Sequence, residues 1–332
     1  SSATDPKARK MKFDDELMGQ LIRFVSSHEV GHTLGLRHNF GSSSTVPVEK
    51  LRDKAWVEAN GHTPSIMDYA RFNYVAQPED GITEKGLFPR IGDYDKWAIE
   101  WGYRWWPELP ATQEAAKLNQ WIISKTGENK CLWFGTESDP NDPRCQNEDL
   151  GDNAMLAGAY GIKNLQRIVP RLIDWTRENN EDYANLKMMY RETINQFNRY
   201  SGHVLKNIGG VMTTPKSVEQ KGAVYAGVSK NRQQDAVKWL QQQVFKTPVW
   251  LLDKEILGKT GNDPVGLIGS LQSPLLDKLL SAGTVNRLIN AQVQFPANAY
   301  NPVMFLNDVE SGIWVELDGQ QSISVYRRNL QK

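Results

Sequence analysis

Apolar residues recur at helical spacing in two separate parts of the chain. Leu17, Ile22 and Val25 belong to a stripe at three- and four-residue intervals, which predicts a helix over residues 14–36 with an inward apolar face. A second helix is predicted over 93–101, and the segment between the two is rich in glycine, serine and proline. From residue 154 onward the pattern stays helical, with long stripes at 183–200, 231–245 and 302–317 and shorter ones at 161–169, 171–178, 249–257, 264–280 and 284–290.

The changes in this pattern divide the chain into three regions. We expect a compact unit over 1–110, a polar, turn-rich insert over 111–153 and a helical carboxy-terminal region over 154–332. The insert contains both cysteines, Cys131 and Cys145. They could form a disulfide, as in an exported protein, or remain two thiols in a reducing compartment. The predicted fold class is mainly α.

Composition and charge exclude several classes of function. The chain has 332 residues, with 39 Lys and Arg against 39 Asp and Glu. This zero net charge argues against nucleic acid and against a polybasic membrane contact. No apolar run approaches the length of a transmembrane helix. The acidic residues of the insert, such as Asp142 and Asp149, make Ca²⁺ a further candidate, although a solvated acidic loop explains them as well.

One stretch points to chemistry: His28-Glu29-Val30-Gly31-His32, followed by Gly35 and His38. Residues four apart on a helix are separated by about 40° around the axis and about 6 Å along it. His28 and His32 can therefore present ring nitrogens to one ion. Gly35 allows a sharp exit from the helix, so that His38 can return as a third ligand.

Three neutral nitrogens around an open fourth position are typical of catalytic zinc. Zinc lowers the pKa of a water molecule toward about 7. Glu29 lies one residue after His28, where it can reach that water as a general base without binding the metal. The residues thus predict metal-assisted hydrolysis.

These residues resemble the long zinc signature of the metzincin metallopeptidases, in which three histidines bind zinc and the glutamate is the general base. Ser65-Ile66-Met67-Asp68-Tyr69 is similar to the methionine-centred turn (Met-turn) below the metal of these enzymes. The resemblance implies that Met67 forms the apolar floor of the site and that Tyr69 stabilises the oxyanion. It also implies that the helix near 93–103 closes the lower part of the domain.

More narrowly, the chain is similar to bacterial metzincin-like proteins with a long helical extension. This likeness implies export to the periplasm, cell envelope or extracellular space, and a peptide or protein as substrate. Metzincins carry a mixed sheet before the active-site helix, but only thirteen residues precede it here. The upper wall of the cleft is therefore lost, supplied by another chain such as an upstream domain of the same precursor, or rebuilt elsewhere in the fold.

Two functions are compatible with these observations. The leading hypothesis is a zinc-dependent endopeptidase. The alternative is a zinc-containing module that binds protein or glycan without catalysis. Substrate identity, oligomeric state and the role of the helical extension stay open.

Overall fold

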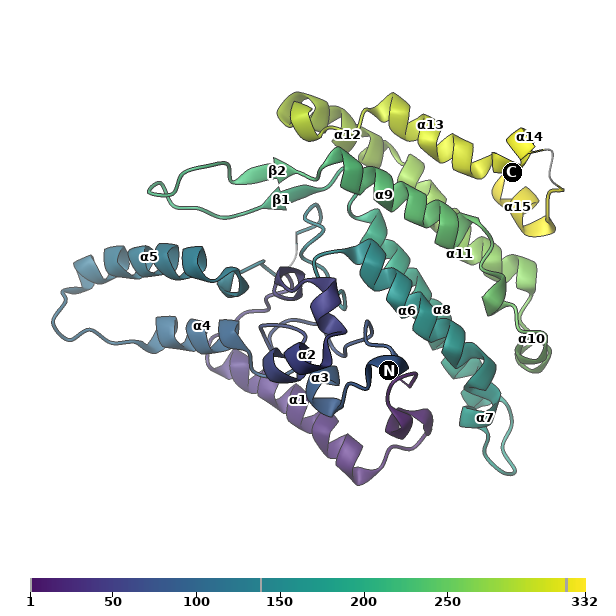
Figure 1. The fold of residues 1–332 in the computed structure, drawn as a ribbon, viewed down its shortest axis with the longest axis horizontal. Helices are drawn as coiled ribbons and strands as arrows, with labels where there is room; N and C mark the ends of the chain where they lie inside the picture. Colours follow the sequence, from purple (N-terminus) through teal and green to yellow (C-terminus); the bar gives the residue numbers. More distant parts are fainter. Residues whose placement is uncertain (1, 138, 320–321) are drawn as a thin grey trace.

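The protein is mainly α-helical, as the sequence pattern predicts (Figure 1). A computed structural model describes residues 2–137, 139–319 and 322–332. No helix among these residues has the length and apolar character needed to cross a lipid bilayer.

The amino-terminal part contains four helices joined by long loops: α1 (Asp15–Thr33), α2 (Lys54–Asn60), α3 (Glu84–Leu87) and α4 (Asp93–Tyr103). The predicted helices over 14–36 and 93–101 are confirmed as α1 and α4. The Asp14 side chain caps α1 by accepting from the Leu17 amide at 2.8 Å. The loops enclose two small apolar clusters rather than one large core.

The inward face predicted for α1 is only partly correct. Leu17 is buried, but Ile22 and Val25 are 58% and 51% exposed. The apolar stripe of α1 is wider than its packed face, because neighbouring segments contact the helix from one side. Its other face carries apolar side chains to the molecular surface.

The predicted polar insert over 111–153 begins with a helix, α5 (Ala111–Glu128), which the turn-rich interpretation missed. α5 buries none of its residues. It lies beside α4 (Figure 1), where the Trp97 and Trp121 rings pack edge-to-face at 4.7 Å between centroids. Cys131 and Cys145 are free thiols in the structure, so the disulfide alternative is not the one observed.

The carboxy-terminal region is the predicted helical assembly, and α6 runs beside α8 (Figure 1). It also contains one antiparallel hairpin that the pattern did not predict, with Met212 opposite Ala226. The elements are α6 (Ala154–Ile168), α7 (Leu172–Thr176), α8 (Ala184–Leu205), β1 (Val211–Thr213), β2 (Tyr225–Gly227), α9 (Lys230–Leu240), α10 (Lys254–Thr260), α11 (Pro264–Leu280), α12 (Ala282–Gln294), α13 (Pro302–Ile313), α14 (Val315–Gly319) and α15 (Val325–Leu330).

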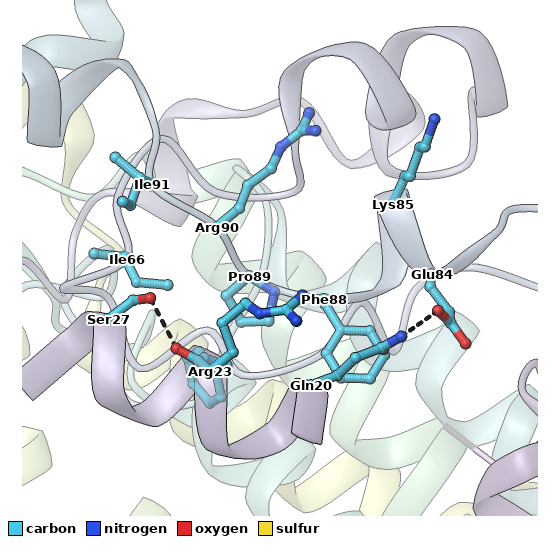
Figure 2. A pocket seen from close by; sticks show the side chains of 11 residues that line it. Gln20, Arg23, Ser27, Ile66, Glu84, Lys85, Phe88, Pro89, Arg90 and Ile91 are labelled. Carbon is cyan, nitrogen blue, oxygen red and sulfur yellow. Dashed lines mark hydrogen bonds between the residues drawn. The ribbon is translucent and has the colours of Figure 1, made fainter. Parts of the chain in front are cut away.

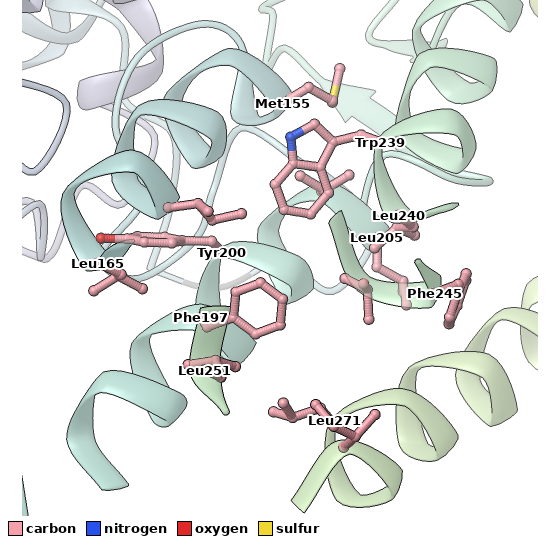
Figure 3. Packing of buried hydrophobic residues seen from close by; sticks show 14 of the residues in the cluster. Met155, Leu165, Phe197, Tyr200, Leu205, Trp239, Leu240, Phe245, Leu251 and Leu271 are labelled. Atoms are coloured by element: carbon pink, nitrogen blue, oxygen red, sulfur yellow. The ribbon is translucent and has the colours of Figure 1, made fainter. Parts of the chain in front are cut away.

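One continuous apolar core joins these helices (Figure 3). Phe197 and Phe245 are fully buried in it, and Trp239 is nearly so. The core is connected to the amino-terminal part through α6, where the Asn164 amide donates to the carbonyls of Tyr74 and Ala76 at 2.9 and 2.8 Å. The helical region therefore supports the loops that follow residues 65–69, a turn called the Met-turn after its resemblance to that of the metzincins.

Candidate metal centre

The end of α1 turns the chain back toward the helix. Gly35 follows the last helical turn with φ +83°, a left-handed conformation that favours glycine. The Leu36 amide donates to the Gly31 carbonyl at 3.0 Å and the Gly35 amide to the His32 carbonyl at 2.9 Å. These two bonds form a Schellman motif. This turn returns His38 to the face of α1 that carries the other two histidines.

The three predicted histidine ligands converge. Ring nitrogens of His28, His32 and His38 all lie within 4.8 Å of one another. Nε2 of His32 and Nε2 of His38 are 3.1 Å apart. Nε2 of His28 is buried and has no hydrogen-bond partner among the described residues. A buried ring nitrogen without a partner, facing two other imidazoles, is an arrangement that a metal ion would satisfy.

The outer nitrogens of two rings are fixed by the backbone. Nδ1 of His28 lies 2.8 Å from the Ile66 carbonyl oxygen, and Nδ1 of His32 lies 2.9 Å from the Leu36 carbonyl oxygen. A carbonyl can only accept, so each Nδ1 donates, which leaves each Nε2 to face the metal position. Burial, followed by the nearby rings of His32 and His28, lowers the pKa of His38. This lowered pKa favours the neutral, metal-binding form of His38.

The donor set fits zinc. Tetrahedral zinc with nitrogen ligands at 2.0–2.1 Å places those nitrogens about 3.3 Å apart, close to the observed separation of 3.1 Å for His32 and His38. Among the described residues, the histidine trio forms the one group of three or more metal-binding side chains. Calcium gains no support, because the Asp142 carboxylate of the insert already accepts from Arg144 at 2.7 Å and from the Thr213 amide at 2.8 Å.

The Met-turn lies directly beneath the histidines. Met67 is fully buried, and its sulfur packs so closely against Gly31 of α1 that there is no space for a β-carbon at this position. Asp95 of α4 holds the turn: its carboxylate accepts from the Ser65 hydroxyl at 2.6 Å and from the Ile66 amide at 2.7 Å. Because the Ile66 carbonyl contacts His28, Asp95 stabilises the orientation of this ring through the turn.

The two remaining predicted site residues lie beside the trio. Glu29 is exposed on α1, and its charge acts on the His38 ring. The Tyr69 ring lies 5.3 Å from the His28 ring and 4.6 Å from the His38 ring, measured between centroids. Phe40 packs against both His38 and Tyr69 and was not predicted from the sequence. No signal in the sequence distinguishes Phe40 from other loop aromatics.

Two buried carboxylates near the Met-turn were also not predicted as part of the site. Asp68 is completely buried, and its Oδ2 accepts from the Ser43 amide at 2.6 Å and the Thr63 hydroxyl at 3.2 Å. Burial raises the pKa of Asp68 to about 7. Burial and the charge of Asp68 together raise the pKa of Asp149. Neither carboxyl belongs to the group of side chains that could bind the metal, and Asp68 supports the Met-turn through its hydrogen bonds.

A cavity of about 460 Å³ lies between α1 and the segment 84–91 (Figure 2). Gln20 and Ser27 line it from α1, and Gln20 donates to Glu84 across it at 2.6 Å. None of the three histidines lines the cavity, whereas Ile66, whose carbonyl contacts His28, does. The cavity therefore adjoins the turn beside the metal centre without including the histidines.

Comparison with known proteins agrees with this site. The sequence matches the family described as Met-zincin over residues 10–321, which is almost the entire chain. Neither the curated proteins nor the solved structures compared with it include a match.

Proposed function

Because the chain belongs to the Met-zincin family, we propose that it is a zinc-dependent endopeptidase in which His28, His32 and His38 bind the metal. The family suggests a zinc metallopeptidase, and the convergence of three imidazoles with ring nitrogens within 4.8 Å is the observation that carries the proposal. When bound, zinc activates water and polarises the substrate carbonyl.

Glu29 moves the protons in the proposed reaction. It follows His28 directly on α1 and its side chain is exposed, so it can reach a water molecule at the open side of the trio. The carboxylate accepts a proton from the water that attacks the peptide carbonyl. It then delivers this proton to the amine that leaves.

Tyr69 is the proposed stabiliser of the oxyanion. Its ring contacts the rings of His28 and His38, so its hydroxyl group belongs to the same side chain cluster. A phenol donates a hydrogen bond to the negative oxygen that develops on the substrate. We expect Tyr69→Phe to lower kcat about 10²-fold while zinc stays bound, in line with the loss of one oxyanion donor.

A matched pair of variants on α1 tests the proposal. Glu29→Gln should abolish hydrolysis of an unfolded protein substrate and retain about one zinc per chain by elemental analysis. Glu16→Gln is the control, because Glu16 is exposed on the same helix far from the histidines. A chelator should remove the activity and added zinc should restore it. Hydrolysis that persists in Glu29→Gln would refute the assignment of the base.

The alternative function is a zinc-containing module that binds protein or glycan without hydrolysis. It is favoured by the uncovered outer face of α1, where Val25 and Val30 flank Glu29 and are 51% and 54% exposed. Extended peptides commonly pair with a strand edge, and the one sheet in the described part of the chain, β1–β2, belongs to the helical region. Zinc binding by the unaltered protein without any peptide cleavage would establish this alternative.

Substrate and location complete the proposal. We expect peptide or protein chains as substrates and export to the bacterial periplasm, envelope or exterior, with an upstream domain of the same precursor as a candidate partner. These expectations follow from the family alone. Fractionation of cells that produce the protein naturally would test export, with detection of the chain in the cytoplasm alone as the contrary result.

A further inference from the structure

The outer nitrogens of the three histidines do not have equivalent partners. Nδ1 of His28 and Nδ1 of His32 each contact a backbone carbonyl oxygen, at 2.8 and 2.9 Å. Nδ1 of His38 instead faces the side chain of Glu137, whose Oε1 lies 3.7 Å away. The third histidine is thus the one whose outer partner is a charged side chain from a distant part of the sequence.

We propose that Glu137 is a positioning residue for the metal centre, which orients His38 so that its Nε2 faces the other two histidines. The inference rests on the proposed zinc site and adds a residue to it. A carboxylate behind a ligating imidazole fixes the ring orientation and tautomer and makes the ligand more basic. Nε2 of His38 does lie toward Nε2 of His32, at 3.1 Å.

Two further contacts hold the Glu137 carboxylate in this place. Oε2 accepts from the Arg37 guanidinium at 2.9 Å, and Oε1 accepts from the His38 backbone amide at 3.3 Å. The Arg37 guanidinium thus lies on the side of the carboxylate away from the His38 ring, and the two contacts together fix the orientation of Glu137. Arg37 thereby positions Glu137, and Glu137 contacts both the backbone and the ring of His38.

The insert carries Glu137 to the site through backbone pairing with the chain beyond His38. The Asn39 side chain donates to the Trp133 carbonyl at 3.0 Å and accepts from the Gly135 amide at 2.7 Å. The Phe40 amide donates to the Thr136 carbonyl at 3.2 Å. Gly41 and Gly135 pack so closely that neither has space for a side chain. The insert is therefore docked directly on the segment that carries the third ligand.

Zinc affinity tests the role of Glu137. Metal-free protein is titrated with zinc in competition with a chromophoric chelator. Glu137→Gln should weaken zinc binding about 10- to 100-fold, as is usual for the loss of a carboxylate behind a ligand. Arg37→Gln should weaken it less, in the same direction. Glu128→Gln, an exposed glutamate at the end of α5, is the matched control and should leave the affinity unchanged.

A second readout separates positioning from general damage. The absorption spectrum of the cobalt-substituted protein should change in Glu137→Gln, because the geometry of one ligand changes, while the circular dichroism of the metal-free variant stays that of the unaltered protein. An unchanged zinc affinity and cobalt spectrum in Glu137→Gln would overturn the positioning role alone. Failure of the unaltered protein to bind zinc would overturn the proposed function and this role together.

Discussion

The helices after residue 154 share one apolar core, whereas the segments around the histidines are held by polar side chains that bond to the backbone. Phe197 and Tyr190 of α8 are fully buried among other apolar residues. In the amino-terminal part that carries the histidines, the buried Asn73 instead bonds to the backbone at three points, which are the carbonyls of Leu51 and Gly86 and the amide of Ala76.

This difference matters for how each region tolerates change. Apolar packing is not directional, so a helical core can adjust to small changes by repacking. A polar bond is directional, and its loss leaves a buried group without a partner. We therefore expect changes in the helical region to alter stability alone, and changes near the Met-turn to alter stability and metal affinity together.

The largest effect is expected in the helical core. Phe197→Ala should lower the free energy of unfolding by about 3–5 kcal/mol through lost burial and a new cavity. Urea denaturation measures this loss, and Met188→Ala, at a 41% exposed position of the same helix, is the control. Zinc affinity of the folded Phe197→Ala protein should be unchanged. A weakened affinity would break the distinction between the two regions.

The pH dependence of stability should reveal Asp68. Its pKa is raised from 3.8 to about 7 by burial, so the folded protein binds a proton that the unfolded chain has released between these pH values. The contribution of Asp68 to the free energy of unfolding is therefore fully present below pH 3.8 and is lost as the pH rises through 7. The loss over this pH range amounts to about 4 kcal/mol. Asp68→Asn, which keeps an acceptor oxygen, should flatten the profile in urea denaturation at several pH values. An identical profile in the variant would contradict the assignment.

Asp95 should couple stability to metal affinity. Asp95→Ala removes the acceptor of the Ser65 hydroxyl and the Ile66 amide, and should cost about 3 kcal/mol, since bonds to a charged group contribute about 1.5–3 kcal/mol each. It should also weaken zinc binding, because the Ile66 carbonyl orients His28. Asp93→Ala, an exposed position on the same helix, is the control. A loss of stability with unchanged zinc affinity would show that the turn does not orient the ring.

The smallest effect is expected at the contact between α1 and the Met-turn. Gly31→Ala places a β-carbon against the Met67 sulfur. Alanine favours a helix by about 1 kcal/mol over glycine, but overpacking costs about 1–3 kcal/mol, so the net loss should be about 1 kcal/mol. The double variant Gly31→Ala, Met67→Leu tests the cause, because relief of the contact should restore part of the stability. Thermal unfolding measures the stability of the single variants and of the double variant. If the stability losses of the two single variants simply add in the double variant, residue 31 and residue 67 are not in direct contact.

Periodicity predicts the helices of the apolar regions well. The stripe at 183–200 corresponds to α8, and the stripe at 302–317 begins with α13. The periodic pattern fails in two places. Ile22 and Val25 fit the same period as Leu17 but lie on the uncovered side of α1, and a pattern alone does not say how much of a stripe is packed. α5 lies inside the segment interpreted as a turn-rich insert, and it is a helix without a buried residue.

The spacing of the histidines suffices to predict their convergence, because the offsets on a helix and the glycine turn are local geometry. The partners of those histidines are not local. Glu137 lies 99 positions from His38 along the chain, and the loop that carries it has no periodic pattern. Asp95 was expected only as part of a closing helix, since nothing in the sequence pairs it with Ser65.

The burial of Met67 makes its sulfur a chemical reporter of local opening. Peroxide converts an accessible methionine to its sulfoxide. Met18 of α1, at 43% exposure, is open to attack, whereas Met67 is fully enclosed. Oxidation of Met67 therefore requires α1 and the turn to separate, and the ratio of the two oxidation rates gives the free energy of that separation.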